Sequence, residues 1–412
     1  MSMNKMLWLL AAALLPLVAL SCGRIHEEDD GENPFKPISL STKQSAYVVS
    51  GNTFAGRFIE RVDAYSENQN EENWFVSPLS LQIALGMLLN GAQGETATEI
   101  CKMLGYGAGE TAEINAYCKL LLEQLPQLDK KTELALANAI FYNKEETLKK
   151  PFRETIKNSY SAWFEGLDFS KKSSVKTIND WCSKQTKGMV PQVIDDVDPG
   201  VMAFLINALY FKSEWENKFP KGNTADKSFT QENNVVKKVK MMKLEGKTFG
   251  YGEHDAYQAV RLPYGNGAYA MTVLLPKKGH TVHDIAALMA KEGMISTSIS
   301  AEVDLWLPRF ESKYHIRLND VLQEMGMVRA FGYGADLLAM FDTPSYVDFV
   351  QQDTAIRVDE EGTVAAAVTV IGTRKNAVGS PQQVVFHADH PFLYLITESS
   401  TGAILFAGKF NG

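Results

Sequence analysis

Length, composition and charge already exclude several classes of protein. With 412 residues, of which 45% are hydrophobic, the chain can bury one large core or two modest ones. No linker rich in proline, glycine or serine and no internal repeat divides it, so we expect one large domain. The net charge of −8 favours solubility and argues against nucleic acid as a partner.

The N-terminal residues have the composition of an export signal. Lys5 precedes an apolar run over residues 6–20, which is too short to span a bilayer comfortably but suits a signal peptide. Small residues at Ala19 and Ser21 suit ordinary signal peptidase. Their place directly before Cys22 also resembles a bacterial lipobox, although the residue order departs from the usual one.

Of these two interpretations we favour the lipoprotein. Residues 1–21 are then the signal peptide, and Cys22 carries acyl chains that anchor the protein stably when there is more than one of them. Residues 22–44, which are acidic and contain prolines, suit a tether. We expect an exported protein on a bacterial membrane, facing the periplasm or the cell exterior; free secretion is the alternative.

Helices are predicted for the first part of the body. Apolar residues spaced over 54–65 form one face of a helix. The Ser77-Pro78 pair supplies a hydroxyl cap and a proline at the first helical position of the next helix. In a third helix, Thr96 and Glu99 are predicted to form a capping box, and Gly105 to end the helix.

Strands are predicted mainly for the later part of the chain. Residues 202–211, 270–275 and 303–307 have the apolar composition of buried strands. Residues 392–397 and 403–410 flank a Ser-Ser-Thr-Gly turn, which indicates a hairpin. The order of these elements predicts an α+β domain with large, mostly antiparallel or mixed sheets.

The sequence contains no arrangement of residues typical of an enzyme or a metal site. It lacks the GxSxG, HExxH and GxxxxGK motifs, and the glycine-rich segment 105–109 follows a predicted helix, so we expect a loop there. His387 and His390 flank Asp389 at a predicted strand entry, where we expect surface or structural roles rather than metal binding. Three further cysteines lack CxxC spacing and lie in apolar stretches, which predicts buried structural thiols: Cys101, Cys118 and Cys182.

Residues 359–370, DEEGTVAAAVTV, match neither an ordinary strand nor an ordinary helix. Acidic residues lead into Gly362, and three alanines precede two valines and a threonine. Small side chains let such a segment pass between existing strands, while the β-branched residues favour an extended backbone. The pattern predicts a loop that can pair as a strand. On these residues alone, an alanine-rich helix or a plain surface loop remains open.

Short motifs follow one another along the rest of the chain. They are residues 73–80 (NWFVSPLS), 138–141 (NAIF), 207–212 (NALYFK), 262–264 (LPY), 274–276 (LLP), 307–310 (LPRF), 386–392 (FHADHPF) and 405–409 (LFAGK). In content, order and spacing they resemble the serpin family of protease inhibitors, over residues 45–412. The resemblance implies an α+β domain with three β-sheets, mostly N-terminal helices and an exposed reactive-centre loop at about residues 360–383.

The resemblance also implies a suicide inhibitor of endopeptidases rather than an enzyme. The catalytic serine or cysteine of the target attacks the loop and forms an acyl-enzyme. The N-terminal part of the loop then inserts into the main sheet as a new central strand, so the uncleaved form is metastable. We expect a monomer without a cofactor, since no basic helix suggests a heparin-type site. The alternatives are a non-inhibitory serpin that acts as a binding protein and an extracytoplasmic hydrolase.

The family pattern assigns the hinge of the loop to residues 360–369. Gly362 lets the chain turn out of its strand, and Thr363 is expected to be the first inward-facing insertion position. Val364 departs from the acidic residue common there but is expected to face outward, and Val368 is bulkier than usual. The complete hinge is Glu360, Glu361, Gly362, Thr363, Val364, Ala365, Ala366, Ala367, Val368 and Thr369.

Family spacing places the reactive bond between Asn376 and Ala377. Arg374 and Lys375 lie just upstream and are alternatives, because the pocket of a trypsin-like protease recognises a cationic side chain. Asn376 or Ala377 would suit an asparaginyl or elastase-like protease. We therefore expect a broad inhibitor of trypsin-like and elastase-like proteases.

Five residues match positions that control the opening of the main sheet in the family. Ser77, Ser80 and Asn207 match a polar cluster beneath the point where the sheet parts. Gln352 stands where many members have a histidine, so a pH-sensitive group is replaced there. Trp215 matches an aromatic residue at the top of the sheet, where the hinge enters.

Overall fold

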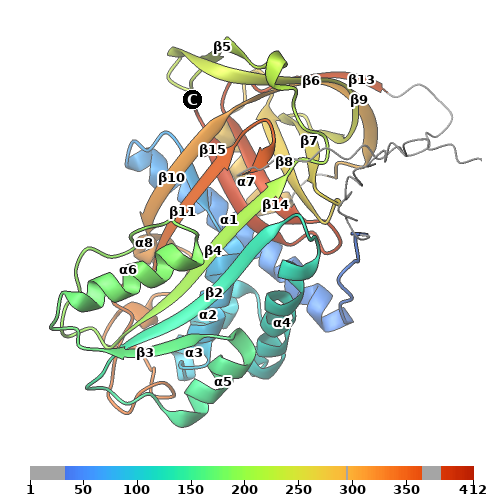
Figure 1. Cartoon of the computed structure of the whole chain (residues 1–412). Helices are drawn as coiled ribbons and strands as arrows, with labels where there is room; N and C mark the ends of the chain where they lie inside the picture. Colours follow the sequence, from blue (N-terminus) through green and yellow to red (C-terminus); the bar gives the residue numbers. More distant parts are fainter. Residues whose placement is uncertain (1–32, 294–295, 364–381) are drawn as a thin grey trace, which may run out of the picture. The chain divides into compact units, whose positions relative to one another are not determined.

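Most helices come from the first half of the chain and most strands from the second (Figure 1). The computed structural model describes residues 33–293, 296–363 and 382–412, and residues 34–412 form one compact unit. The helices are α1 (Thr42–Asn68), α2 (Pro78–Leu89), α3 (Gly94–Leu104), α4 (Thr111–Gln124), α5 (Lys150–Tyr160), α6 (Ser173–Gln185), α7 (Val282–Glu292) and α8 (Asn319–Glu324). Short 3-10 turns cover Leu125–Gln127, Lys221–Asn223 and Arg329–Phe331.

The strands divide between two hydrogen-bonded sheets. A six-stranded sheet has the order β10 (Phe310–Arg317), β11 (Gln351–Val358), β12 (Gly362–Thr363), β4 (Ala203–Glu214), β2 (Glu133–Asn143) and β3 (Trp163–Leu167). A nine-stranded sheet has the order β1 (Trp74–Val76), β15 (Ile404–Phe410), β14 (Phe392–Glu398), β8 (Tyr269–Pro276), β7 (Tyr257–Tyr264), β6 (Val236–Glu253), β9 (Ile299–Pro308) and β13 (Gln382–His387). The ninth strand, β5 (Ala225–Thr230), pairs with β6.

The long strand β6 joins two parts of the nine-stranded sheet. Its register with β9 shifts between Leu244 and Lys247, where Gly246 has a φ of 67° that glycine adopts without steric cost. Before the shift β6 pairs with β5 and β9, and after it with β9 and β7. The predicted α+β fold is confirmed. The three predicted sheets correspond to the six-stranded sheet and these two parts.

The start of α2 follows the sequence prediction closely. Ser77 precedes the helix with an extended backbone, and its side chain accepts a hydrogen bond from the backbone N–H of Ser80. Pro78 occupies the first helical position, where no N–H is needed. The Ser77 hydroxyl also donates to the Leu405 carbonyl of β15 at 2.7 Å, which ties the start of α2 to the nine-stranded sheet.

The predicted capping box of the third helix is wrong. The helix α3 begins at Gly94, and Thr96 therefore lies inside its first turn rather than before it. The Thr96 hydroxyl instead accepts from the backbone N–H of Asp336 at 3.0 Å. Glu99 accepts from the backbone N–H groups of Val328 and Arg329, so both side chains bind a distant C-terminal segment. The predicted end at Gly105 is correct, with φ of 74°.

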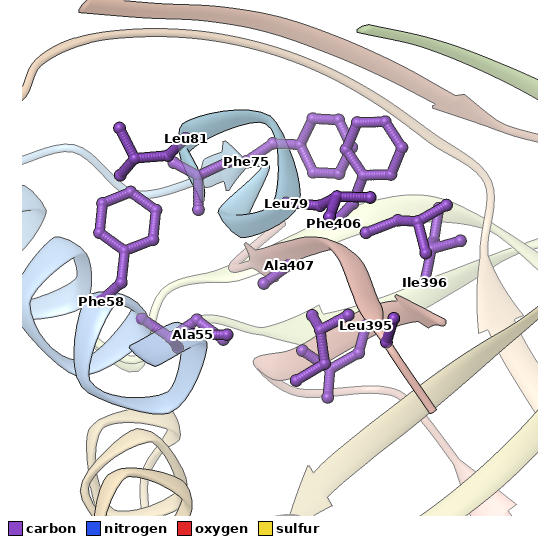
Figure 2. Packing of buried hydrophobic residues seen from close by; sticks show 14 of the residues in the cluster. Ala55, Phe58, Phe75, Leu79, Leu81, Leu395, Ile396, Phe406 and Ala407 are labelled. Carbon is purple, nitrogen blue, oxygen red and sulfur yellow. The ribbon is translucent and has the colours of Figure 1, made fainter. Parts of the chain in front are cut away.

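The main core lies between α1, α2 and the strands β1, β14 and β15. Figure 2 shows Phe58 of α1 and Leu81 of α2 on one side of this core, with Leu395 and Ile396 of β14 on another. Phe75 of β1 stacks on Phe406 with ring centroids 5.1 Å apart. This packing buries nearly every residue of α2, which is apolar on almost all sides.

The three cysteines of the described chain are buried, and His387 packs against β9. Cys101, Cys118 and Cys182 are buried and free, and burial raises the pKa of the Cys118 and Cys182 thiols to about 12. The ring of His387 stacks on Trp306, and its Nε2 lies 3.0 Å from Asp304. No helix in the described part of the chain is both long enough and apolar enough to cross a bilayer.

Candidate functional site

The short strand β12 enters the six-stranded sheet between two longer strands. Thr363 pairs with Val358 of β11 on one side and with Ser213 of β4 on the other, and both pairings are antiparallel. Gly362 pairs with Glu214. The chain therefore reaches residue 363 already placed as the first residues of a central strand between β11 and β4.

Beyond β12 the two neighbouring strands part. Within the described ranges, no backbone pairing joins β4 to β11 along the rest of their length. A cavity of about 410 Å³ lies there, lined by β4, β11, the segment before β11 and α2. The facing strand edges carry backbone N–H and C=O groups that an incoming strand can pair.

Thr363 is buried in the structure. The residue is 2% exposed, and its hydroxyl lies 2.8 Å from the hydroxyl of Tyr264. Ser213, directly opposite on β4, is also buried and bonds to Thr132 at 2.6 Å. Two hydrogen-bonded pairs of hydroxyl side chains, Thr363 with Tyr264 and Ser213 with Thr132, thus lie at the entry point, which explains why a small polar residue fits at position 363.

Gly362 allows the hinge to approach β4 closely. A Cβ at this position would collide with the Ser213 carbonyl oxygen and lie only 2.6 Å from the Cα of Glu214. Glycine is therefore needed at position 362 for close backbone contact.

Trp215 holds the turn that precedes β12. Its indole Nε1 donates to the carbonyl of Asp359 at 2.9 Å, and its backbone N–H donates to the carbonyl of Glu361 at 2.8 Å. The indole is buried and stacks on Tyr264. The structure therefore places Trp215 beside the hinge, at the entry to the sheet.

The two hinge glutamates are bound by residues that the sequence analysis missed. Glu361 forms ion pairs of 3.0 Å with both Lys218 and Lys221, and hydrogen bonds from these lysines hold its pKa below the ordinary value. Glu360 is buried and accepts from the Thr224 hydroxyl at 2.7 Å. These contacts tie the hinge to the segment that follows β4.

Glu360 has a further cationic neighbour, Arg309, 3.7 Å away at the end of β9. The residues that bind the hinge lie some 50 to 150 positions away from it in sequence. No local sequence pattern links a lysine or arginine to a glutamate so far along the chain. These partners of the hinge therefore could not be predicted from residue spacing.

The polar cluster predicted beneath the sheet lies on the wall of the cavity. Gln352 binds the backbone of Ser77 twice, accepting from its N–H at 3.1 Å and donating to its carbonyl at 2.8 Å. The Ser80 hydroxyl donates to the Asn207 side chain. Because Gln352 lies on β11 and Asn207 on β4, the N-terminal end of α2 bridges the two strands that part.

The hydrogen-bond network continues past Asn207 to residues that the sequence analysis did not assign to the site. Asn207 donates to Asn138 of β2 at 2.6 Å, and Asn138 donates to the carbonyl of Tyr160 at 2.8 Å. The Tyr160 hydroxyl donates to Asn115 of α4 at 2.8 Å. The signal available in the sequence was the place of Asn138 in one of the recognised motifs, and the structure pairs it opposite Asn207.

Several predicted site residues lie outside the described ranges. They are the outer hinge residues Val364, Ala365, Ala366, Ala367, Val368 and Thr369, the bond candidates Arg374, Lys375, Asn376 and Ala377, and Cys22.

Comparisons with known proteins identify the family. Residues 50–412 match the family described as serpin (serine protease inhibitor). Iripin-3 of Ixodes ricinus is 33% identical over 356 residues, which cover 82% of this chain and 89% of that protein. The structure of Serpin48 from the insect Tenebrio molitor has a TM-score of 0.79 at 26% identity, covering 90% of this chain and 100% of that chain.

A second solved structure differs in its described ligand. Human thyroxine-binding globulin in complex with thyroxine has a TM-score of 0.77 at 26% identity, covering 90% of this chain and 99% of that chain. Proteins of this fold thus include one whose name describes small-molecule binding. The family match over residues 50–412, together with a hinge that enters a parted sheet, shows that the chain belongs to the serpin family, whose members are generally protease inhibitors rather than enzymes.

Proposed function

We propose that this serpin is a suicide inhibitor that traps endopeptidases by inserting its reactive-centre loop between β4 and β11. One observation carries the proposal: β12 already pairs with both strands, which then part. The inserted strand would continue from Thr363 in the direction that β12 has begun. The cavity beneath the gap would receive its inward-facing side chains.

The chemical step uses the target's own nucleophile. The serine or cysteine attacks the carbonyl of the residue before the reactive bond, an acyl-enzyme forms, and the peptide that begins at the next residue leaves with a new amino group. Insertion then carries the acylated protease away before water releases it. Insertion must be faster than hydrolysis of the acyl-enzyme, so it has to be driven by a large release of free energy. The intact inhibitor is therefore kept by a kinetic barrier in a form of higher free energy than the inserted form.

We extend the register of β12 to propose where each later residue would pair. Because both pairings are antiparallel, each later residue of the loop would pair with the preceding residue of β4 and of β11. Val364 would therefore pair with Lys212 and Arg357. In the same register Thr369 would lie between Asn207 and Gln352. About ten added residues, at about 1 kcal/mol for each backbone hydrogen bond, would release on the order of 10 kcal/mol.

The alternation of a strand assigns the inserted side chains to two faces. Ala365, Ala367 and Thr369 would share the inner face with Thr363, which is buried. Ala366 and the valines Val364 and Val368 would face outward. The inner positions thus carry only small residues, as insertion above α2 requires.

The targets proposed are trypsin-like and elastase-like proteases. Cleavage between Asn376 and Ala377 would follow the family spacing, whereas Arg374 or Lys375 would suit a trypsin-like pocket. The hinge ties at Glu360 and Glu361 support a loop that is anchored at its N-terminal end before cleavage.

The export signal and anchor also remain part of the proposal. Residues 1–21 would be removed, Cys22 would be acylated, and residues 22–44 would tether a monomeric inhibitor to a bacterial membrane, facing the periplasm or the exterior. Secretion without an anchor is the alternative.

A binding protein without inhibitory activity is the second candidate. The likeness to thyroxine-binding globulin and the largely apolar lining of the 410 Å³ cavity favour it. In that case the loop would be cut without trapping the protease.

A gel assay on soluble protein lacking residues 1–22 separates the two. With trypsin and with elastase, inhibition predicts a denaturant-resistant complex of summed mass, and mass spectrometry of the released C-terminal peptide fixes the bond. Ala365→Arg, on the inner face, should turn the inhibitor into a substrate. Ala366→Arg is the matched control on the outer face and should still trap. Equal trapping by both variants would contradict the insertion register.

A further inference from the structure

We propose that Asp63, Glu67 and His283 form a zinc site that joins α1 to α7. Asp63 and Glu67 are four residues apart on α1 and so lie on the same face of the helix. His283 lies in the first turn of α7. One ligand atom from each of the three residues lies within 4.8 Å of the others.

Two of the ligands already have the spacing that zinc needs. The Oδ2 atom of Asp63 lies 3.2 Å from the Nδ1 atom of His283. In tetrahedral coordination with bonds of about 2.0–2.1 Å, neighbouring ligand atoms lie roughly 3.3 Å apart. Glu67 is exposed, so its carboxylate can rotate to the third position without disturbing the core. A water molecule would complete the tetrahedron.

The second oxygen of Asp63 is held by other partners. Its Oδ1 accepts from the Trp74 indole at 2.9 Å, and the Lys409 ammonium lies 3.8 Å from the same atom. Lys409 itself is drawn to Glu232, at 2.7 Å. Because Trp74 and Lys409 bind Oδ1, the other oxygen, Oδ2, remains directed at His283. Residues that bind a metal ligand rather than the metal itself orient that ligand and strengthen metal binding.

The local charge favours a divalent cation. Asp63 and Glu232 share one lysine, Lys409, and the carboxylate of Glu67 lies beside Asp63 and His283. The three carboxylates and the one lysine sum to two negative charges, and Asp63 is completely buried. One Zn²⁺ would balance them, and a buried charge is stable only when it is paired.

The types of donor atom at the site indicate which metal would bind there. Imidazole nitrogen together with carboxylate oxygen suits Zn²⁺, whereas Mg²⁺ and Ca²⁺ prefer sites made of oxygen alone. The two helices also pack closely about two turns away from the site, where a Cβ at Gly56 of α1 would lie 2.8 Å from the Met289 carbonyl of α7. Zinc would therefore add a bond between two helices that already pack tightly.

Calorimetric titration of the folded protein with Zn²⁺ tests the site directly, with Mg²⁺ as the comparison metal. We expect one zinc per chain, a higher midpoint of thermal unfolding with zinc than with magnesium, and the visible absorption of tetrahedral Co²⁺ when cobalt replaces zinc. Loss of an outer partner alone weakens metal sites about 10–100-fold, so His283→Ala and the exposed variant Glu67→Gln should each weaken zinc binding at least about 100-fold.

His280→Ala is the matched control, because His280 precedes α7 and lies near Asp284 rather than Asp63. It should bind zinc as the wild type does. Absence of one-to-one binding by the wild type would overturn the proposal. So would unchanged affinity in both His283→Ala and Glu67→Gln, since zinc would then be held elsewhere.

Discussion

Trp215 and Tyr264 stack face to face at the entry of the six-stranded sheet. Their ring centroids are 4.4 Å apart and their planes differ by 10°. The indole of Trp215 binds the carbonyl of Asp359, and the hydroxyl of Tyr264 shares a hydrogen bond with Thr363. The two rings thus hold both ends of the turn through which the hinge enters the sheet.

Replacing Trp215 should loosen that turn. Trp215→Ala removes a buried ring and the bond to Asp359, and we expect a loss of about 3–5 kcal/mol in the free energy of unfolding, as for other buried aromatic residues. Trp215→Phe keeps most of the stacking on Tyr264, and its free energy of unfolding should fall by only about 1–2 kcal/mol. Urea unfolding of both variants gives the comparison. Equal losses would contradict the role assigned to the stacked ring.

The ion pairs of Glu361 should make the hinge sensitive to acid. Lys221 and Lys218 hold the pKa of Glu361 below its ordinary value of 4.5 in the folded protein. A carboxyl group with a lowered pKa contributes stability that is complete above the unfolded value and is lost as pH falls through the folded value. We therefore expect the hinge tie to be intact at neutral pH and to weaken below about pH 4.5.

Glu361→Gln isolates this effect from the titration of other carboxylates. The difference in unfolding free energy between wild type and variant should be constant from pH 7 to 5 and shrink as the pH falls further. A difference that does not change with pH would show that the charge of Glu361 contributes nothing to the fold.

Removal of the Ser77 hydroxyl should destabilise the fold more than removal of an ordinary helix cap. Ser77→Ala deletes the cap of α2 and the bond to the Leu405 carbonyl, and we expect the free energy of unfolding to fall by about 2–3 kcal/mol. Thr281→Ala removes the exposed cap of α7 and should cost about 1 kcal/mol. Chemical unfolding of the pair is the measurement. A loss in Ser77→Ala no larger than in Thr281→Ala would mean that the link to β15 is unimportant.

Gln352→His should introduce a pH dependence that the wild type lacks at this site. Gln352 both accepts from and donates to the Ser77 backbone in a buried setting. A protonated imidazole can only donate, and burial disfavours its charge. We expect the variant to lose stability, relative to wild type, as pH falls below about 6.5. Parallel stability profiles from pH 8 to 5 would contradict this.

The sequence predicted those parts of the fold that depend on local chemistry. The Ser77-Pro78 pair located the start of α2, and Gly105 located the end of α3, because caps need particular residues at particular positions. Thr96 and Glu99 were misassigned. Both have the composition of a capping box, but distant backbone N–H groups bind them instead, and no local pattern reveals such partners.

In the functional site, too, some residues could be predicted from the sequence and others could not. The resemblance to the family singled out Trp215, Thr363 and Gln352, and in the structure Trp215 and Thr363 lie where the hinge enters and Gln352 where the sheet parts. Lys218 and Lys221 were missed, because ion pairs with Glu361 bring together residues some 140 positions apart. Only the folded register of β12, β4 and β11 shows which residues an inserting strand would meet.

Thermal stability before and after cleavage of the loop tests the central claim most directly. The soluble protein is cut within residues 370–381 by a protease that it does not trap, and both forms are melted under the same conditions. Insertion between β4 and β11 predicts a large rise in the unfolding midpoint for the wild type and for Ala366→Arg, and little rise for Ala365→Arg. An unchanged midpoint in the cleaved wild type would contradict insertion and favour the binding protein.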